Sequence, residues 1–274
     1  MPELPEVQTI VDVLSPYLKN KKIIFVRVFS PDVIARPDLY EFDSSVTNQV
    51  FSSVTRRGKF IIFSFNSGKR LTLHLRMTGA LTLNRPTDTI EPHTHVTFLL
   101  DNGEELRYND WRRFGRFWLI DSSEEDTFSG VDSLGYEPFD KSLNADYLIK
   151  AFGKSSRAIK TCLMDQKIIA GIGNIYSDEI LFSSRILPER PSSSLTTDEW
   201  ETLSKKIPVV MSFFVEKNRV SINDFRLSNG REYRNSKFFN VYGRNGCPCN
   251  KCGLPLDSCS ISGRTSVFCR NCQK

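Results

Sequence analysis

Histidine is scarce in this sequence, and several common catalytic motifs are missing from it. The 274 residues include only three histidines, which are too few and too poorly spaced for a catalytic histidine–metal cluster. There is also no HExxH, GxSxG or P-loop motif. These absences disfavour metal-dependent hydrolysis and NTP hydrolysis as the function.

Long apolar runs are missing too. No stretch approaches the roughly 20 apolar residues of a membrane-spanning helix, and the N-terminus lacks the charged and apolar regions of a secretory signal. We therefore expect an intracellular, cytoplasmic protein without a membrane partner. With 39% hydrophobic and 25% charged residues and no internal repeat, the chain is long enough for two folded domains and a small appendage.

Positive charge is in modest excess and is unevenly distributed. Lys and Arg number 37 against 32 Asp and Glu, which gives a net charge of +5. Basic residues cluster at 56–59, 112–116 and 226–237, and aromatic residues are interleaved with the last two clusters. This pattern is typical of a surface that binds nucleic acid, although a solvated charged face would look similar.

The cysteines concentrate at the C-terminus. Two Cys-x2-Cys pairs, Cys249 with Cys252 and Cys269 with Cys272, are separated by sixteen residues. This spacing is typical of a four-thiolate zinc site, and the lack of a nearby histidine favours one structural Zn²⁺ over a catalytic one. Unliganded thiols are the alternative. The cysteines that we interpret as bystanders are Cys162, Cys247 and Cys259. The last two could substitute for one of the four ligands.

Apolar spacing predicts a helix first and then a β-rich segment. Helical periodicity runs from Val7 to Leu18, with Pro5 suited to the first turn and Pro16 expected to kink or end the helix. Runs rich in β-branched and aromatic residues follow, up to about Asp121. The predicted strands are Ile23–Phe29, Phe60–Phe65, Leu71–Leu75, Val96–Leu100, Glu105–Tyr108 and Phe117–Ile120. Together they indicate a β-sandwich or flattened barrel.

Helical patterns dominate the second half, after an acidic, Ser-rich segment at 121–130 that we interpret as a linker. The shorter predicted helices are Tyr147–Phe152, Arg157–Gln166 and Ile175–Ser184. A longer helix begins at the capping box of Thr196 and Glu199 and is expected to bend at Pro208. The predicted fold class is therefore α+β and multidomain. Its parts are a β-sandwich with a leading helix at 1–130, a helical domain at 131–240 and a zinc hairpin at 241–274.

The N-terminus carries an unusual combination of groups. Removal of Met1 would leave Pro2 with a free secondary amine, and an α-amino group has a pKa of about 7.7 to 8.0, well below that of lysine. Such an amine is partly unprotonated and nucleophilic at neutral pH. Glu3 and Glu6 place carboxylates nearby for general acid/base catalysis. The alternative interpretation is an ordinary charged helix N-cap.

Five segments, in the same order, resemble bacterial formamidopyrimidine-DNA glycosylase over almost the whole chain. They are Pro2–Glu6, Arg57–Lys59, His74–Met77, Gly171–Tyr176 and the C-terminal cysteine hairpin. The resemblance implies a monomeric base-excision-repair enzyme of the bacterial nucleoid. Such an enzyme is both a DNA glycosylase and an abasic-site lyase, and it removes 8-oxoguanine and formamidopyrimidines from duplex DNA. The helical domain is implied to be a helix-two-turn-helix domain with a lesion-capping loop.

The same resemblance assigns catalytic roles. Pro2 would attack C1′ of the damaged nucleotide, expel the base and form a Schiff base that drives β- and then δ-elimination. Glu3 would be the acid/base catalyst, Glu6 would assist proton transfer, and Lys59 would contact the lesion or its phosphate. In the zinc hairpin, Arg264 would contact DNA and take part in the elimination step.

Six further residues are implied to bind DNA. Met77 and Phe114 would wedge into the duplex, and Arg112 would hydrogen-bond the orphaned base. For Met77 and Phe114, core packing is the alternative. The other implied DNA-binding residues are His93, Lys160 and Asn174. The last two are expected to hold phosphate groups.

Three departures from the family pattern bear on substrate choice. Trp111 stands where the family usually has Val, and Asn218-Arg219 stands where the lesion-capping loop, here 218–237, usually begins with Gly-Gly. Thr265 occupies a position that is often Gly or Ala. These departures leave the lesion preference open.

Two rival functions are weighed against this interpretation. One is the related endonuclease VIII branch, which acts on oxidised pyrimidines. Leu4, where that branch typically has Gly, favours the purine branch together with the implied wedge residues. The other rival is a non-catalytic zinc-hairpin protein that binds damaged or kinked DNA, and the presence of Pro2, Glu3 and Lys59 disfavours it.

Overall fold

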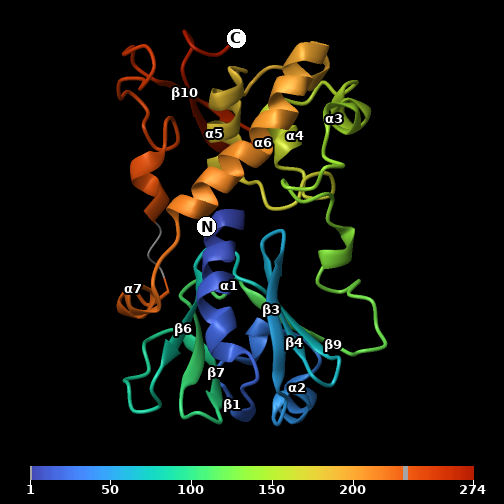
Figure 1. Cartoon of the computed structure of the whole chain (residues 1–274), viewed down its shortest axis with the longest axis vertical. Coiled ribbons are helices and arrows are strands. Elements are labelled where there is room, and N and C mark those ends of the chain that lie inside the picture. The colour runs from blue at the N-terminus through green and yellow to red at the C-terminus, as the bar shows by residue number, and fades with distance from the viewer. Residues whose placement is uncertain (1, 231–233) are drawn as a thin grey trace. The chain divides into compact units, whose positions relative to one another are not determined.

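The computed structural model describes residues 2–230 and 234–274, and the chain forms two compact units. Unit 1 comprises Met1–Ser133 and Asn218–Tyr233, and unit 2 comprises Leu134–Lys217 and Arg234–Lys274. Figure 1 labels helices and strands of both units where there is room. The start of the predicted lesion-capping loop thus packs with unit 1. The three-domain division by function stays a prediction.

Unit 1 begins with helix α1 (Leu4–Leu18), which packs against strand β3 (Phe51–Arg57). The helix was predicted, and its apolar positions, such as Val7 and Leu14, are buried. It does not end at Pro16 but continues to Leu18. A proline so close to the C-terminus removes only one intrahelical hydrogen bond, which the buried apolar face offsets.

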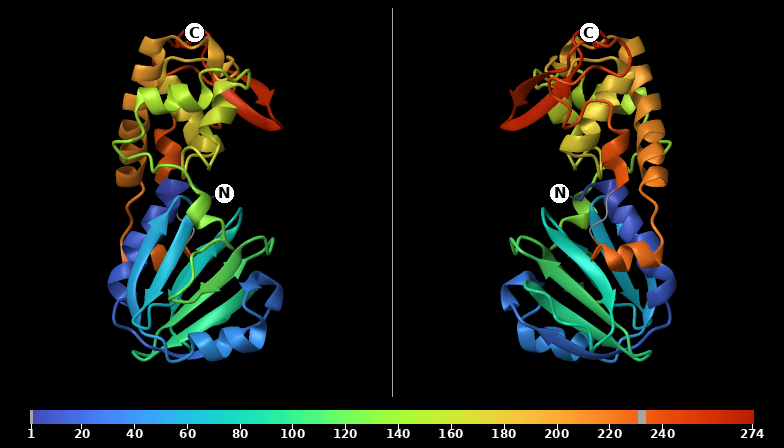
Figure 2. Two further views of the ribbon diagram at one scale, coloured as in Figure 1. Left: turned by 90° about the vertical axis from the view of Figure 1, so that its right-hand side faces the viewer. Right: turned by 90° about the vertical axis from the view of Figure 1, so that its left-hand side faces the viewer.

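Unit 1 also contains two sheets (Figures 1 and 2). The four-stranded sheet has, in spatial order, β1 (Ile23–Val28), β7 (Thr94–Leu100), β8 (Glu105–Asp110) and β6 (Gly79–Asn84). The five-stranded sheet has β2 (Ile34–Arg36), β9 (Arg116–Ile120), β5 (Arg70–His74), β4 (Phe60–Phe65) and β3. Neighbours are antiparallel except for the parallel pair of β2 and β9. The additional helices of unit 1 are α2 (Leu39–Val46) and α7 (Ile222–Leu227).

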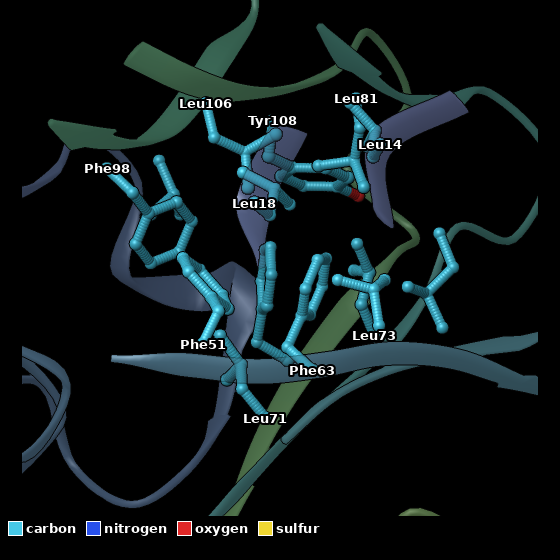
Figure 3. Close-up of a cluster of buried hydrophobic side chains, with 14 of the residues drawn as sticks. Leu14, Leu18, Phe51, Phe63, Leu71, Leu73, Leu81, Phe98, Leu106 and Tyr108 are labelled. Carbon is cyan, nitrogen blue, oxygen red and sulfur yellow. The ribbon is translucent and has the colours of Figure 1, made fainter. Parts of the chain in front are cut away.

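The core lies between the two sheets. Figure 3 shows aromatic and leucine side chains from both sheets and from α1 meeting there. The ring of Phe117 in the five-stranded sheet packs edge-on against Phe98 and Tyr108 in the four-stranded sheet, with centroids 6.1 Å and 5.0 Å apart. The predicted β-sandwich is therefore confirmed.

Unit 2 is mostly helical, as predicted. Its helices are α3 (Ala145–Phe152), α4 (Ile159–Leu163), α5 (Asn174–Ser184) and α6 (Thr197–Lys217). Short 3₁₀ turns lie at Pro31–Val33 and Val131–Ser133 in unit 1 and at Ser192–Ser194 and Arg234–Phe238 in unit 2. The predicted capping box opens α6, because Thr196 N–H donates to Glu199 Oε2 at 2.8 Å and Glu199 N–H donates to Thr196 Oγ1 at 3.3 Å.

A hairpin of β10 (Asp257–Ile261) and β11 (Arg264–Phe268) completes unit 2 (Figure 2). Val267 and Leu256 form a small buried cluster with Phe182 of α5 and with the cysteines Cys249 and Cys269. In the described part of the chain, no helix is both long and apolar enough to cross a membrane.

Candidate active site and DNA-binding surface

Strand pairing brings several turns to one end of the sandwich. Phe60 pairs with His74, and His74 also pairs with Arg116, so the turns before β4, after β5 and before β9 are neighbours. Gly79 pairs with Asp110 and Thr94 pairs with Asn109, which adds the turns before β6, before β7 and after β8. These turns carry six of the residues singled out in the sequence, namely Lys59, Met77, His93, Trp111, Arg112 and Phe114. We call this end of the sandwich the turn end.

The N-terminus reaches the same turn end. The guanidinium of Arg56, at the end of β3, donates to Gln8 Oε1 at 2.8 Å and so fixes the first half of α1 there. Pro2, Glu3 and Glu6 precede Gln8 and are all buried. The Glu3 N–H donates to Glu6 Oε2 at 2.9 Å, and the two residues form a capping box for α1. The structure thus contains the ordinary capping arrangement, in which the buried Glu3 directly follows Pro2.

Lys59 lies in the two-residue turn between β3 and β4, where Arg57 pairs with Phe60. Gly58 has φ +55, a left-handed conformation that glycine adopts without strain, and this bend turns the chain back at Lys59. The lysine side chain is only 8% exposed. Its positive charge therefore lies in a partly desolvated position, where interactions with an anion are stronger than in water.

His74 is a buried neutral imidazole at the turn end. Burial, together with the positive charges of Arg76 and Lys59, lowers the pKa of His74 to about 3. The Arg76 N–H donates to His74 Nδ1 at 2.9 Å, which requires this nitrogen to be unprotonated. The ring packs edge-on against Phe60. These contacts fix the turn that leads to Met77.

Asp110 organises the turn that carries Arg112 and Phe114. Burial alone raises the pKa of Asp110, but hydrogen bonds from Thr78, Tyr108 and the backbone outweigh this and hold the pKa below its usual value. The backbone donors are the N–H groups of Gly115 at 2.9 Å and Arg112 at 3.2 Å. The Asp110 carboxylate therefore holds both ends of this turn, at Arg112 and at Gly115, against the end of β8.

Met77, Arg112 and Phe114 meet in one exposed cluster. Arg112 donates from Nη1 to Met77 Sδ at 3.2 Å, and its guanidinium lies 4.5 Å from the Phe114 ring centroid. Met77 is 44% and Phe114 46% exposed. Core packing, the alternative considered for both residues, is therefore wrong. His93 is exposed as well, with φ +66, and its carbonyl accepts from Asp110 N–H at 3.0 Å.

Lys160 in unit 2 is fully buried. Its ammonium lies 2.8 Å from Asp178 Oδ1 and donates to the Thr265 carbonyl at 3.2 Å. Burial raises the pKa of Asp178 to about 6, although the charge of Lys160 opposes the shift. Asp178 also accepts from Val267 N–H at 3.2 Å. Here the lysine and aspartate tie α4 and α5 to β11, whereas the sequence predicted Lys160 as a phosphate ligand.

Asn174 begins α5, directly after its N-cap Gly173. The first turn of a helix leaves backbone N–H groups without intrahelical partners, which suits an anion. Within the described residues, the buried Oδ1 of Asn174 has no hydrogen-bond partner. Arg264 opens β11 beside the turn of Ser262 and Gly263, whose φ values of +49 and +73 fit a tight hairpin, and it is exposed.

The four predicted zinc ligands meet. The Sγ atoms of Cys249, Cys252, Cys269 and Cys272 all lie within 4.8 Å of one another, so they could hold a metal ion. Cys249 and Cys272 are 3.9 Å apart, and Cys252 and Cys269 are 3.5 Å apart. A tetrahedral zinc with Zn–S bonds of about 2.3 Å separates its sulfurs by roughly 3.8 Å. The thiol set therefore fits the size and chemistry of zinc.

Sequence reasoning missed Asp110, Asp178 and Glu179. Glu179 is 2% exposed and accepts hydrogen bonds from the backbone N–H groups of Asn240, Val241 and Tyr242 at 2.9–3.0 Å. It thereby fixes the segment that enters the cysteine hairpin. The Asp178-Glu179 pair directly before the apolar run Ile180–Phe182 was the available signal, because acidic residues are rarely buried without partners.

Comparison with known proteins matches both units. The model of the formamidopyrimidine-DNA glycosylase N-terminal domain matches residues 1–117, and that of the formamidopyrimidine-DNA glycosylase H2TH domain matches residues 134–226. The formamidopyrimidine-DNA glycosylase of Pelotomaculum thermopropionicum is 39% identical over 274 residues, covering 100% of this chain and 99% of the relative. The enzyme of Moorella thermoacetica is 41% identical over 94% of both chains. The chain belongs to the formamidopyrimidine-DNA glycosylase family.

Solved structures of this family have the same fold. Lactococcus lactis Fpg in complex with DNA containing an abasic site has a TM-score of 0.92 and 28% identity, covering 100% of both chains. A Lactococcus lactis Fpg mutant bound to DNA containing Fapy-dG also has a TM-score of 0.92, with 29% identity over 100% of both chains. The predicted fold class and family are confirmed, including a helix-two-turn-helix domain in the helical half.

Proposed function

We propose that this protein is a base-excision-repair DNA glycosylase and abasic-site lyase that removes 8-oxoguanine and formamidopyrimidines from duplex DNA. The observation that supports the proposal is the turn end of unit 1, which holds the nearly buried Lys59 and to which the Arg56–Gln8 hydrogen bond fixes the helix that follows Pro2 and the buried Glu3. It combines an N-terminal amine, a carboxylate and a cation. We infer that the protein acts on DNA of the bacterial nucleoid, in the cytoplasm.

Pro2 is the nucleophile in this proposal. Its secondary amine attacks C1′ of the damaged nucleotide, the bond from C1′ to the base breaks, and the base leaves with a proton. Glu3 moves protons at the sugar, with Glu6 assisting. The C1′–O4′ bond then breaks, O4′ takes a proton, and the opened sugar carries a protonated Schiff base at C1′. The Schiff base withdraws electrons, so loss of a C2′ proton breaks the 3′ C–O bond, and a second elimination breaks the 5′ C–O bond.

Base removal requires the damaged nucleotide to leave the stack, which costs a few kcal/mol. Met77 and Phe114 are exposed apolar side chains that can fill the resulting gap, and Arg112 can hydrogen-bond the orphaned base. Lys59 and His93 at the same turn end bind neighbouring phosphates or the lesion. This assignment explains why large apolar side chains are exposed there.

Unit 2 supplies the remaining DNA contacts. Asn174, at the start of α5, binds a phosphate together with the helix N-terminus, and Arg264 reaches the DNA from the zinc hairpin and assists elimination. We retain Lys160 as a contributor to phosphate binding. Because Lys160 is buried in an ion pair and donates to the Thr265 carbonyl, its contribution is indirect: it positions the strand that carries Arg264. A Zn²⁺ ion held by the four thiolates fixes the hairpin and takes no part in the chemistry.

Duplexes with a single lesion test this function. The protein should nick the strand at 8-oxoguanine opposite cytosine and at an abasic site, and leave an undamaged duplex intact. Preferential nicking at thymine glycol or 5-hydroxycytosine would favour the endonuclease VIII branch. Tight binding of all these duplexes without any nicking would indicate a non-catalytic DNA-binding protein.

A further inference from the structure

We propose that Trp111 is an additional DNA-binding residue, whose indole stacks on a base left exposed when a neighbouring nucleotide is missing from the duplex. The proposal rests on the proposed repair function but concerns a side chain to which that function assigns no role. Trp111 directly precedes Arg112, a member of the cluster to which the proposed function assigns filling of the gap.

Exposure distinguishes Trp111 from the other two tryptophans. Its side chain is 62% exposed, whereas Trp118 is 9% and Trp200 2% exposed. Met77 and Phe114, at the same turn end, are also nearly half exposed. Several large apolar side chains presented to solvent at one place mark a binding surface, because water contact with them is unfavourable.

Hydrogen bonds of Asp110 fix the backbone of the turn that carries Trp111. Asp110, directly before Trp111, accepts from Tyr108 Oη at 3.0 Å and from Gly115 N–H at 2.9 Å. Its own N–H donates to the His93 carbonyl at 3.0 Å. Because the backbone that carries Trp111 is already fixed, less conformational entropy is lost on binding than at a mobile loop, so more of the stacking energy contributes to affinity.

The surrounding charge favours a nucleic acid as the occupant. Arg112, Arg113 and Arg116 follow Trp111 within five positions and provide cations for phosphates. Aromatic faces combined with basic side chains bind unstacked bases by stacking. An intact duplex has no free base face, whereas a duplex with an abasic site does. Trp111 should therefore discriminate between the two duplexes.

Binding measurements with four proteins test the proposal. Wild type, W111V, W111F and the control Y40V are titrated with a duplex containing a tetrahydrofuran abasic analogue and with the same duplex undamaged. Tyr40 is an 87% exposed aromatic residue on α2, a helix that packs with β1 and β2 rather than carrying the turns. We expect W111V to bind the abasic duplex about five-fold or more weakly. W111F and Y40V should stay within about two-fold of wild type, and all four should bind the undamaged duplex alike.

Tryptophan emission gives an independent readout. Because Trp111 is the exposed tryptophan, acrylamide should quench it in the unbound protein, and the abasic duplex should protect it. W111F supplies the baseline from the two buried tryptophans. Unchanged acrylamide quenching, an unaffected W111V, or an equal loss on both duplexes would overturn the proposal. If wild type nicks a strand at an abasic site but the expected binding and quenching differences are not found, the repair function stands and only the role of Trp111 is wrong.

Discussion

The ammonium of Lys160 lies 2.8 Å from the carboxylate of Asp178, and neither side chain is exposed to solvent. The pair joins α4 to α5, and both residues also hold β11, through the Thr265 carbonyl and the Val267 N–H. The strand that begins with Arg264 is thus fixed by a buried charge pair as well as by the cysteine cluster.

Breaking this pair should be costly, whereas removing both charges should be mild. K160M and D178N should each lower the free energy of unfolding by about 3–5 kcal/mol, because each leaves one buried group without its counter-charge. K160M/D178N should lose much less than the sum, since the amide oxygen that D178N introduces can still accept from the Val267 N–H. Urea unfolding at pH 7 measures all three. The exposed pair of Lys205 and Glu201 is the control, and K205M should cost under about 1 kcal/mol.

The pKa of Asp178 makes the cost of the K160M substitution depend on pH. Its pKa is raised to about 6 with Lys160 present, and K160M removes an influence that lowers it. In K160M the carboxyl should therefore be protonated at pH 5, and the cost of the substitution should be smaller there than at pH 7. An equal cost at both pH values would contradict the assignment of a buried charge.

His74 should make the fold less stable in mild acid. Its pKa in the folded protein is about 3, against about 6.5 unfolded, so the unfolded chain binds more protons between these values and stability falls as pH decreases through this window. Between pH 7 and pH 5 the contribution amounts to about 2 kcal/mol. Urea unfolding of wild type and H74Q at both pH values should show a smaller pH dependence for H74Q. H93Q, at an exposed histidine, should behave like wild type.

Asp110 should matter for DNA binding through the turn it holds. D110N keeps the shape but weakens the hydrogen bonds to Gly115 and Arg112, so we expect several-fold weaker binding of an abasic duplex by a folded protein. Because the pKa of Asp110 is lowered on folding, its stabilising contribution is present above about pH 4 and is lost as pH falls further. The difference in unfolding free energy between wild type and D110N should therefore shrink toward pH 3.

The cysteine hairpin should hold one zinc per chain. Elemental analysis of the purified protein should find one equivalent, which C252S loses and C247S or C259S retains. Chelation should lower both the thermal stability and the affinity for DNA, because so short a hairpin has little core of its own. Retention of one equivalent by C252S together with its loss in C247S would mean that the ligand set is different.

Local patterns predicted most elements of the fold. The bounds of β4 at Phe60–Phe65 were predicted correctly because apolar residues fill the strand. Strand β3 was missed, since its Ser, Thr and Arg residues do not alternate with apolar ones and only Phe51 and Val54 are buried. Strand β6 was missed as well, because Gly79 and Ala80 carry no β signal although both are buried. In both strands, packing of the buried side chains in the folded sheet outweighs the weak intrinsic preference of these residues for the strand conformation.

The sequence singles out candidate site residues only where their motifs are contiguous. Pro2, Glu3 and the cysteine pairs lie in short segments, whereas the environment of Lys160 depends on Thr265, 105 positions away. No local pattern shows that a lysine is buried against a distant strand. The exposure of Met77 and Phe114 likewise became evident only from the turns that carry them.

The central claim, catalysis through an amine at Pro2, is tested most directly by borohydride trapping. Wild type and a protein with a blocked N-terminus are mixed with a duplex containing 8-oxoguanine opposite cytosine, and borohydride is added to reduce any Schiff base. A covalent protein–DNA adduct should form with wild type, map to the N-terminal peptide and be absent from the blocked protein. An adduct of equal yield with the blocked protein, or none with wild type bound to the duplex, would contradict the account.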